Sequence, residues 1–369
     1  MLDRRTFLQA AGLAAVAGPA ALSACASDPQ DVSQANRLVQ YGTPAGPANV
    51  LLSWYGIADR LGYFAEEGIN SQVRTAISPF PLVDNGRLQM IVAGASELLP
   101  FVAGNPSSDL MVAWTSTPQP FYRTVVPADS DVSEFHQLAG KKIACLGPGA
   151  LWWLIDAICT ESGMSPTDVT KVTVPAGAAL ATAFRKGQVD AGIYADAQVV
   201  QADELLAGTA LGPLRVLPLP AGLQKTGGTT NIVKRSSLDR DRDLYVRYMR
   251  AVAKGFTFLD ANPAAGMAVH LDGFPSLRQP GESRREAIDR MVTEVQPRLQ
   301  VSRAPEWAAQ KHPWGWTYEE NLTGWQRIIP ALKGTQLDVS RLYTNDLVAP
   351  AHEFDVAAVQ AAARAHPVD

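Results

Sequence analysis

Short apolar runs alternate with longer amphipathic stretches through much of the chain. Residues 50–52 form one such run, and residues 57–67 repeat apolar side chains with a helical period before a closing glycine, Gly68. Residues 69–75 then have the composition of a strand. This order predicts a strand, a helix and a second strand, the unit from which parallel sheets are built.

A later part of the chain repeats this pattern. Residues 142–146 form an apolar, strand-like run, a glycine-rich turn follows at 147–149, and residues 150–162 are predicted as a helix. Residues 82–92 and 183–193 also match each other, each as a helix end, a glycine and a strand. Two copies of one plan predict an α/β protein with two doubly wound lobes, each built on a parallel-rich sheet.

Two breaks in the pattern predict where the chain passes between these lobes. Prolines interrupt a strand-like segment close to residue 119, and prolines and glycines cluster again at residues 217–230. Two such crossings would form a hinge. The region after residue 244 is largely helical and is expected to cover the first lobe. The predicted lobes are residues 48–118 with 229–369, and residues 119–228.

The N-terminal residues carry the pattern of an export signal. Arg4 and Arg5 precede an uncharged run, residues 10–24, which ends in small residues before Cys25. Paired arginines before Phe and Leu are typical of the twin-arginine route. The ending is similar to a bacterial lipobox, in which the cysteine is acylated.

Three expectations follow for this segment. Residues 1–25 are predicted to be the signal, Cys25 to carry the lipid that anchors the protein to the membrane, and polar residues 26–47 to be a flexible tether. The protein would then work in the periplasm or on the outer face of the cytoplasmic membrane. The alternative is a soluble periplasmic protein whose Cys25 is removed with the signal.

Composition and charge exclude some classes of function. The formal net charge is −4, so we expect no nucleic-acid partner, which would require a concentrated basic face. Cys145 and Cys159 fall in a predicted strand and the following helix, without His or Cys at metal-ligand spacing. We expect two buried thiols, no metal and no cofactor. A disulfide between the two cysteines is the alternative.

Three short segments carry a resemblance to a known family. They are Gly-Tyr-Phe-Ala-Glu-Glu-Gly-Ile at 62–69, Leu-Ala-Gly-Lys-Lys-Ile at 138–143 and Gly-Gln-Val-Asp-Ala at 187–191. In this order and spacing, the chain from about residue 50 to residue 359 resembles the solute-binding proteins of the nitrate, sulfonate and taurine type of ABC importer. That family includes binders of the thiamine pyrimidine precursor.

The resemblance implies a type II periplasmic binding protein fold, whose lobes close on a small-molecule ligand and present it to an ABC permease. It implies a monomer that is not an enzyme. Gln89 and the bulky Ser53-Trp54-Tyr55 depart from the family pattern, which indicates an unusual ligand. The alternatives are a pyrimidine-synthase-like or dehydratase-like enzyme on the same scaffold, and a ligand-sensing subunit of a membrane receptor.

Ligands of open parallel sheets bind beyond the carboxyl ends of the strands, near helix N-termini. Helix N-termini favour a carboxylate or sulfonate, and aromatic side chains at strand ends favour an aromatic or heterocyclic ligand. Packing in the core is the alternative for each aromatic residue, and helix capping is the alternative for Asp196. The residues predicted to face the ligand are Trp54, Tyr55, Ser96, Trp114, Phe121, Gly149, Trp152, Tyr194, Asp196 and Thr229.

Overall fold

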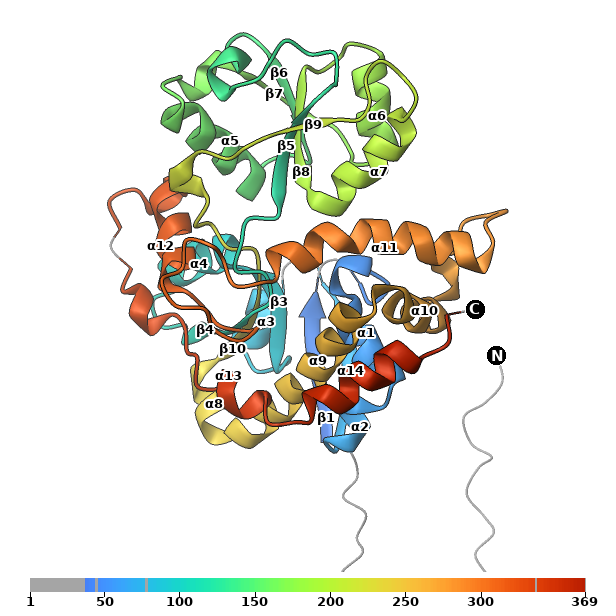
Figure 1. Ribbon diagram of the computed structural model, residues 1–369. Helices are drawn as coiled ribbons and strands as arrows, with labels where there is room; N and C mark the ends of the chain where they lie inside the picture. Colours follow the sequence, from blue (N-terminus) through green and yellow to red (C-terminus); the bar gives the residue numbers. More distant parts are fainter. Residues whose placement is uncertain (1–36, 44–45, 77–78, 336, 369) are drawn as a thin grey trace, which may run out of the picture. The chain divides into compact units, whose positions relative to one another are not determined.

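Two five-stranded sheets organise the part of the chain that the computed structural model describes, residues 37–43, 46–76, 79–335 and 337–368 (Figure 1). Both sheets belong to one compact unit that spans residues 36–369. The predicted signal, the lipidation site Cys25 and the first part of the predicted tether lie outside the described residues.

The first sheet has the strand order β2-β1-β3-β10-β4. Strand β1 pairs in parallel with β2 and β3, whereas β10 runs antiparallel to β3 and β4. The strands are β1 (Arg37–Thr43), β2 (Ile69–Thr75), β3 (Met90–Gly94), β4 (Leu110–Thr115) and β10 (Thr229–Lys234).

The second sheet repeats this plan in the order β7-β6-β8-β5-β9. Strand β6 is parallel to β7 and β8, and β5 is antiparallel to β8 and β9. Each sheet thus has one antiparallel strand, β10 in the first sheet and β5 in the second. Each of these is the strand that the chain forms directly after it crosses from the other sheet. The strands are β5 (Tyr122–Val126), β6 (Lys142–Cys145), β7 (Thr170–Thr173), β8 (Ala191–Ala195) and β9 (Arg215–Leu217). The predicted fold of two parallel-rich α/β lobes is confirmed.

Helices cover both sheets. Those of the first lobe, which contains the first sheet, are α1 (Ser53–Arg60), α2 (Tyr63–Glu66), α3 (Phe80–Asp84), α4 (Ala95–Gly104), α8 (Arg235–Arg240), α9 (Arg242–Ala261), α10 (Pro263–Gly273), α11 (Arg284–Val301), α12 (Glu319–Ile328), α13 (Val348–Ala351) and α14 (Val356–Ala365). Those of the second lobe are α5 (Ala150–Glu161), α6 (Ala178–Arg185) and α7 (Asp196–Leu206). Helix α11 of the first lobe packs against α7 of the second (Figure 1).

The first strand lies earlier than the sequence pattern predicted. Strand β1 occupies residues 37–43, so this part of the predicted tether is wrong. Val39 and Tyr41 alternate inward along β1, and all seven residues of the strand pair with β2. Residues 50–52, the predicted strand, form a short 3₁₀ helix that leads into α1.

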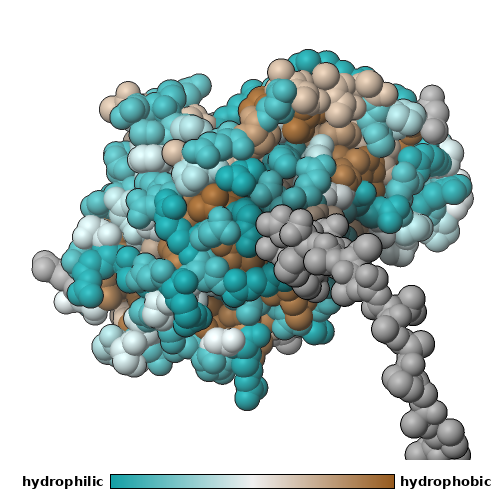
Figure 2. Space-filling model, turned by 90° about the horizontal axis from the view of Figure 1, so that it is seen from below, coloured by the Kyte–Doolittle hydropathy of each residue, from teal (hydrophilic) through white to brown (hydrophobic). Residues whose placement is uncertain are grey.

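Cys145 and Cys159 are free and buried, as predicted. Burial raises the pKa of the Cys159 thiol to about 11, so it is protonated at neutral pH. Among the described helices, none combines the length and apolar character that a bilayer crossing requires. Figure 2 shows one face of the molecule, on which hydrophilic side chains predominate and hydrophobic ones appear in separate areas.

Candidate ligand-binding site

A pocket of about 250 Å³ lies where the two lobes meet. On the first-lobe side, Thr43 and Gly94 end the parallel strands β1 and β3, and Thr229 begins β10 beside them. On the opposite side, Tyr122 begins β5 and Ala150 begins α5. The pocket therefore occupies the place beyond the strand ends where open α/β sheets bind ligands.

The walls of this pocket are largely apolar, with a few polar side chains. Leu51, Leu52, Val92 and Trp325 supply apolar surface, and Tyr122 adds an aromatic ring. The polar side chains are Thr43, Asn49, Ser96 and Thr229. Of the described residues, Glu97 and Arg298 are the charged ones that line it. Such a wall suits a small organic molecule with an apolar body and polar ends.

The two helices that begin at the pocket differ in how their N-termini are satisfied. In α4, the Gly94 N–H donates to Glu97 Oε2 at 3.0 Å, so a carboxylate already occupies this helix start. In α5, Gly149 precedes the helix with a φ of 125° and no side chain caps the first turn. This left-handed backbone favours glycine, and it leaves N–H groups beside Ala150 for a ligand.

Among the described residues, Arg298 is the cation that lines the pocket, and no sequence motif selected it. The Arg298 and Asp196 side chains are 2% and 1% exposed, and Nη2 of Arg298 donates to Asp196 Oδ1 at 3.1 Å. The guanidinium carbon lies 4.1 Å from the centre of the Phe121 ring, a cation–π distance. Because Arg298 belongs to α11 and Asp196 begins α7, this ion pair connects the two lobes.

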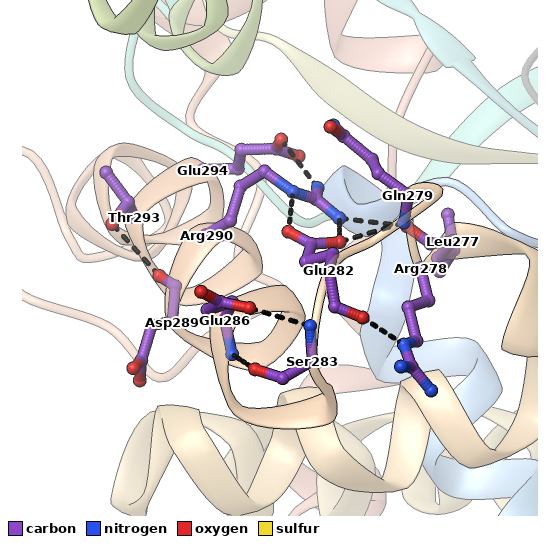
Figure 3. Close-up of polar contacts among 10 residues, drawn as sticks. All are labelled: Leu277, Arg278, Gln279, Glu282, Ser283, Glu286, Asp289, Arg290, Thr293 and Glu294. Carbon is purple, nitrogen blue, oxygen red and sulfur yellow. Dashed lines mark hydrogen bonds and ion pairs between the residues drawn. The ribbon is translucent and has the colours of Figure 1, made fainter.

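Helix α11 is held firmly at its other end (Figure 3). Ser283 Oγ accepts from Glu286 N at 3.2 Å, and Glu286 Oε2 accepts from Ser283 N at 2.7 Å, which completes a capping box. Arg290 donates to Glu282 Oε1 at 2.9 Å and to Glu294 Oε1 at 3.1 Å. These hydrogen bonds raise the pKa of Arg290 and, with backbone contacts, lower that of Glu282. These contacts hold the N-terminal part of α11 in place, and Arg298 lies near the other end of the same helix.

A family model described as "NMT1/THI5 like" matches residues 53–266, which is more than half of the chain. The chain belongs to the NMT1/THI5-like family. This confirms the family resemblance that the sequence motifs indicated. No curated protein matches the sequence at a significant level.

Solved structures share the fold of this NMT1/THI5-like protein at low sequence identity. A protein from Bordetella bronchiseptica RB50 has a TM-score of 0.61 at 16% identity, over 86% of this chain and 97% of that chain. The alkanesulfonate-binding protein SsuA from Xanthomonas axonopodis pv. citri, bound to MOPS, has a TM-score of 0.52 at 19% identity, over 86% and 97%. The periplasmic nitrate-binding protein NrtA from Synechocystis PCC 6803 has a TM-score of 0.53 at 11% identity, over 90% and 98%. The shared architecture is that of periplasmic binding proteins.

Five of the predicted ligand-facing residues lie at or beside the pocket of this NMT1/THI5-like protein. Ser96, Phe121 and Thr229 line it. Gly149 directly precedes the lining residue Ala150. Asp196 does not line the pocket but binds Arg298, which does.

Four of the predicted aromatic residues are buried in the cores of the lobes and do not line the pocket: Trp54, Tyr55, Trp114 and Tyr194. Trp54 and Tyr55 lie on the inner face of α1, because the segment that holds them is a helix and not the end of a strand. Trp114 and Tyr194 are each the last residue but one of a strand, β4 and β8. Successive side chains of a strand point to opposite faces, and these two point into the cores.

Specific contacts hold these aromatic side chains in the cores. The Tyr55 hydroxyl is hydrogen-bonded to the side chain of Asn231, and burial raises its pKa to about 12. The Tyr194 hydroxyl donates to the Val174 carbonyl at 2.8 Å. Trp152, the remaining predicted residue, does not line the pocket either; it is half-buried on α5, with Lys171 Nζ 5.2 Å from the centre of its ring. The rings of Tyr55 and Tyr194 thus lie in the cores of the lobes, outside the lining of this pocket.

Other pocket residues were missed by the sequence analysis. Trp325 comes from α12, in the C-terminal region, and its Nε1 donates to the Gly227 carbonyl at 2.6 Å. Leu51 and Leu52 lie in the segment mistaken for a strand. Tyr122 and Glu97 each neighbour a residue that the strand-end rule selected, Phe121 and Ser96. Within the described ranges, no group of three or more His, Cys, Asp or Glu side chains is placed to hold a metal ion.

Proposed function

We propose that this protein is an extracytoplasmic substrate-binding protein of an ABC importer, which captures a small organic ligand by closing its lobes around the hinge. One observation carries the proposal: the pocket is lined from both lobes, and both chain crossings run along it. Phe121 belongs to the first crossing, and Gly228 and Thr229 belong to the second. A rotation at the crossings would separate the walls and admit the ligand.

The proposed lobes are residues 48–118 with 229–369, and residues 119–228, to which β1 adds residues 37–43 in the first lobe. Each proposed boundary falls between the last strand of one sheet and the first strand of the other. The proposal includes no catalytic activity.

The ligand we propose has an aromatic or heterocyclic body and one acidic group, a carboxylate or a sulfonate. Phe121, Tyr122 and Trp325 offer ring surface for the body. The uncapped N-terminus of α5 offers N–H groups and a partial positive charge for the acid. The names of two structural relatives support this class, since one binds alkanesulfonates and the other binds nitrate.

We further propose that the twin-arginine route exports the protein, that acylated Cys25 anchors it, and that a membrane permease receives the ligand from the monomeric protein. The support is the sequence pattern at Arg4, Arg5 and Cys25. Mass spectrometry of protein from the membrane fraction should find a lipid on an N-terminal Cys25. A Cys25→Ala variant should appear in the soluble fraction, and a variant that stays in the membrane would contradict the anchor.

Binding is tested by a thermal-shift screen of aromatic carboxylates, sulfonates and pyrimidines, with small-angle scattering of each complex. A ligand that binds only the native state raises Tm, and closure reduces the radius of gyration. If sugars or polyamines raise Tm and no acid does, the proposed ligand class is wrong. If no compound both binds and compacts the protein, the proposed closure is wrong.

The position of the acidic group is tested by Ala150→Asp. A carboxylate at this first residue of α5 suits the helix dipole, so the fold should be retained. It would repel the acid of the ligand, and we expect affinity to fall by about tenfold or more. The matched control is Ala178→Asp, an exposed first residue of α6 that does not line the pocket. Equal affinities of the two variants would contradict the assignment.

A further inference from the structure

The ion pair between Arg298 and Asp196 has a consequence for the ligand. We propose that it makes Arg298 a specificity-determining residue, which receives an uncharged acceptor group of the ligand and excludes a second acidic group. The inference rests on the proposed function, because it concerns the ligand of the same pocket.

The charge of Arg298 is already compensated. Its side chain is 2% exposed and that of Asp196 is 1% exposed, with 3.1 Å between Nη2 and Oδ1. Charges buried to this extent are stable only when they are paired. A guanidinium without Asp196 would attract an anion to this end of the pocket, whereas the neutral pair does not.

Arg298 nevertheless keeps hydrogen-bonding capacity for a ligand. Its Nε has no partner among the described residues, although it is buried. Its Nη1 lies 3.5 Å from Thr229 Oγ1, a long contact. Both residues line the pocket. Because a buried donor without a partner is costly, a carbonyl, amide or ring nitrogen of the ligand would be stabilised at this end.

A second acid would meet carboxylates in this region. Asp196 Oδ1 accepts from Arg298 and from Ala197 N at 2.9 Å, whereas the buried Oδ2 has no donor among the described residues. Glu97 adds another carboxylate to the wall of the pocket. An anionic group at Arg298 would thus be repelled by two carboxylates while sharing a single guanidinium. The ligand should carry its acid at α5 and an uncharged group at Arg298.

This selection operates when the lobes close. Arg298 is in the first lobe and Asp196 is in the second, so opening at the hinge would separate the pair. A ligand with two acidic groups could meet Arg298 in an open protein. Closure would then bring Asp196 against the second acid, and the closed state would be disfavoured.

The test uses pairs of probes of the same shape. 4-Carbamoylbenzoate has one acid and one amide on a benzene ring, and terephthalate has two acids in the same positions. The pair 4-carbamoylbenzenesulfonate and 4-sulfobenzoate repeats the comparison for a sulfonate. Titration calorimetry with the mature protein should show about tenfold or stronger preference for the amide compounds. Small-angle scattering should show compaction with the amides and none with the diacids.

Variants of the pair identify the cause of the preference. Asp196→Asn leaves Arg298 uncompensated, so the preference for the amide should shrink or reverse. Arg298→Lys retains the charge and should keep part of the preference. The matched control is Glu204→Gln, which removes an exposed carboxylate from the same helix and should leave the preference unchanged.

Each result decides between the two proposals. Equal affinity of the wild type for an amide and its diacid, with compaction by both, overturns the role of the ion pair and leaves the proposed function standing. An unchanged preference in Asp196→Asn overturns it as well. If that variant does not fold, the comparison on the wild type still decides. If the wild type binds neither these probes nor any other compound of the thermal-shift screen, the proposed function itself fails.

Discussion

Gly228 is a position where the two chain crossings are in direct contact, and adding a single methyl group there should separate them. The Gly228 N–H donates to the Thr117 carbonyl at 2.8 Å, which ties the second crossing to the first. A Cβ at residue 228 would lie within 3.0 Å of Phe121 ring atoms and of Thr117 Oγ1. Gly228→Ala therefore places its methyl group directly between the crossings.

The loss of stability in Gly228→Ala depends on how far Phe121 and Thr117 are able to move away from the added methyl group. Favourable contacts between heavy atoms lie at about 3.5–4.0 Å, so Gly228→Ala overlaps its neighbours by at least about 0.5 Å. The Thr117 hydroxyl is buried and accepts from Thr229 N, and the Phe121 ring is held against Arg298 at 4.1 Å. Overpacking of such a site lowers the free energy of unfolding by about 1–3 kcal/mol. We also expect the lobes to close less readily.

Urea denaturation measures the stability change, and small-angle scattering with the best ligand of the screen measures closure. The matched control is Gly104→Ala, because a Cβ at residue 104 would meet nothing within 4 Å and the residue ends α4. That control should be neutral or slightly stabilising, since alanine favours the helix. A Gly228→Ala protein as stable as the control, and with normal compaction, would refute the reasoning.

Three further predictions concern the first lobe. Trp54→Ala should lower the free energy of unfolding by about 3–5 kcal/mol, because Trp54 is a buried core residue. The folded variant should bind the ligand with unchanged affinity. A loss of affinity at normal stability would instead identify Trp54 as a ligand contact. Burial lowers the pKa of His270 to about 4, below its ordinary value of 6.5. As the pH is lowered from 6.5 to 4, the unfolded chain therefore binds a proton at this residue while the folded protein does not, and the free energy of unfolding falls. Urea titrations should show this dependence reduced in His270→Gln but unchanged in a variant of the exposed His136, and an equal slope in both would contradict it. Ser283→Ala removes the cap of α11 and should cost about 1 kcal/mol, whereas an unchanged urea midpoint would show that the cap is not needed.

Patterns within short stretches of the sequence determined much of the fold. The repeated strand, turn and helix predicted two lobes, and clusters of proline and glycine predicted the crossings near residues 119 and 217–230, which the structure places between the two sheets. The rule that ligands bind at strand ends selected Ser96, Phe121 and Thr229, all of which line the pocket. The prediction of the fold succeeded because backbone periodicity and turn chemistry are local properties.

The direction of a side chain was decided by tertiary structure. Trp114 and Tyr194 lie near the ends of strands β4 and β8, yet both rings point into the cores of the lobes. Side chains alternate between the two faces of a strand, and only the packing of the layers decides which face meets the core. Strand β1 was missed because its residues also suit a polar tether, and only its pairing with β2 along its whole length distinguishes the two.

The sequence by itself determined the two-lobed plan, the crossings and the approximate place of the pocket. The tertiary structure alone placed Arg298 in the wall of that pocket and paired it with Asp196. Arg298 and Asp196 lie 102 positions apart and on different lobes, and no sequence motif contains both residues. Burial away from water strengthens the attraction between the two charges and makes an unpaired charge costly, and this burial exists only after the two lobes have met.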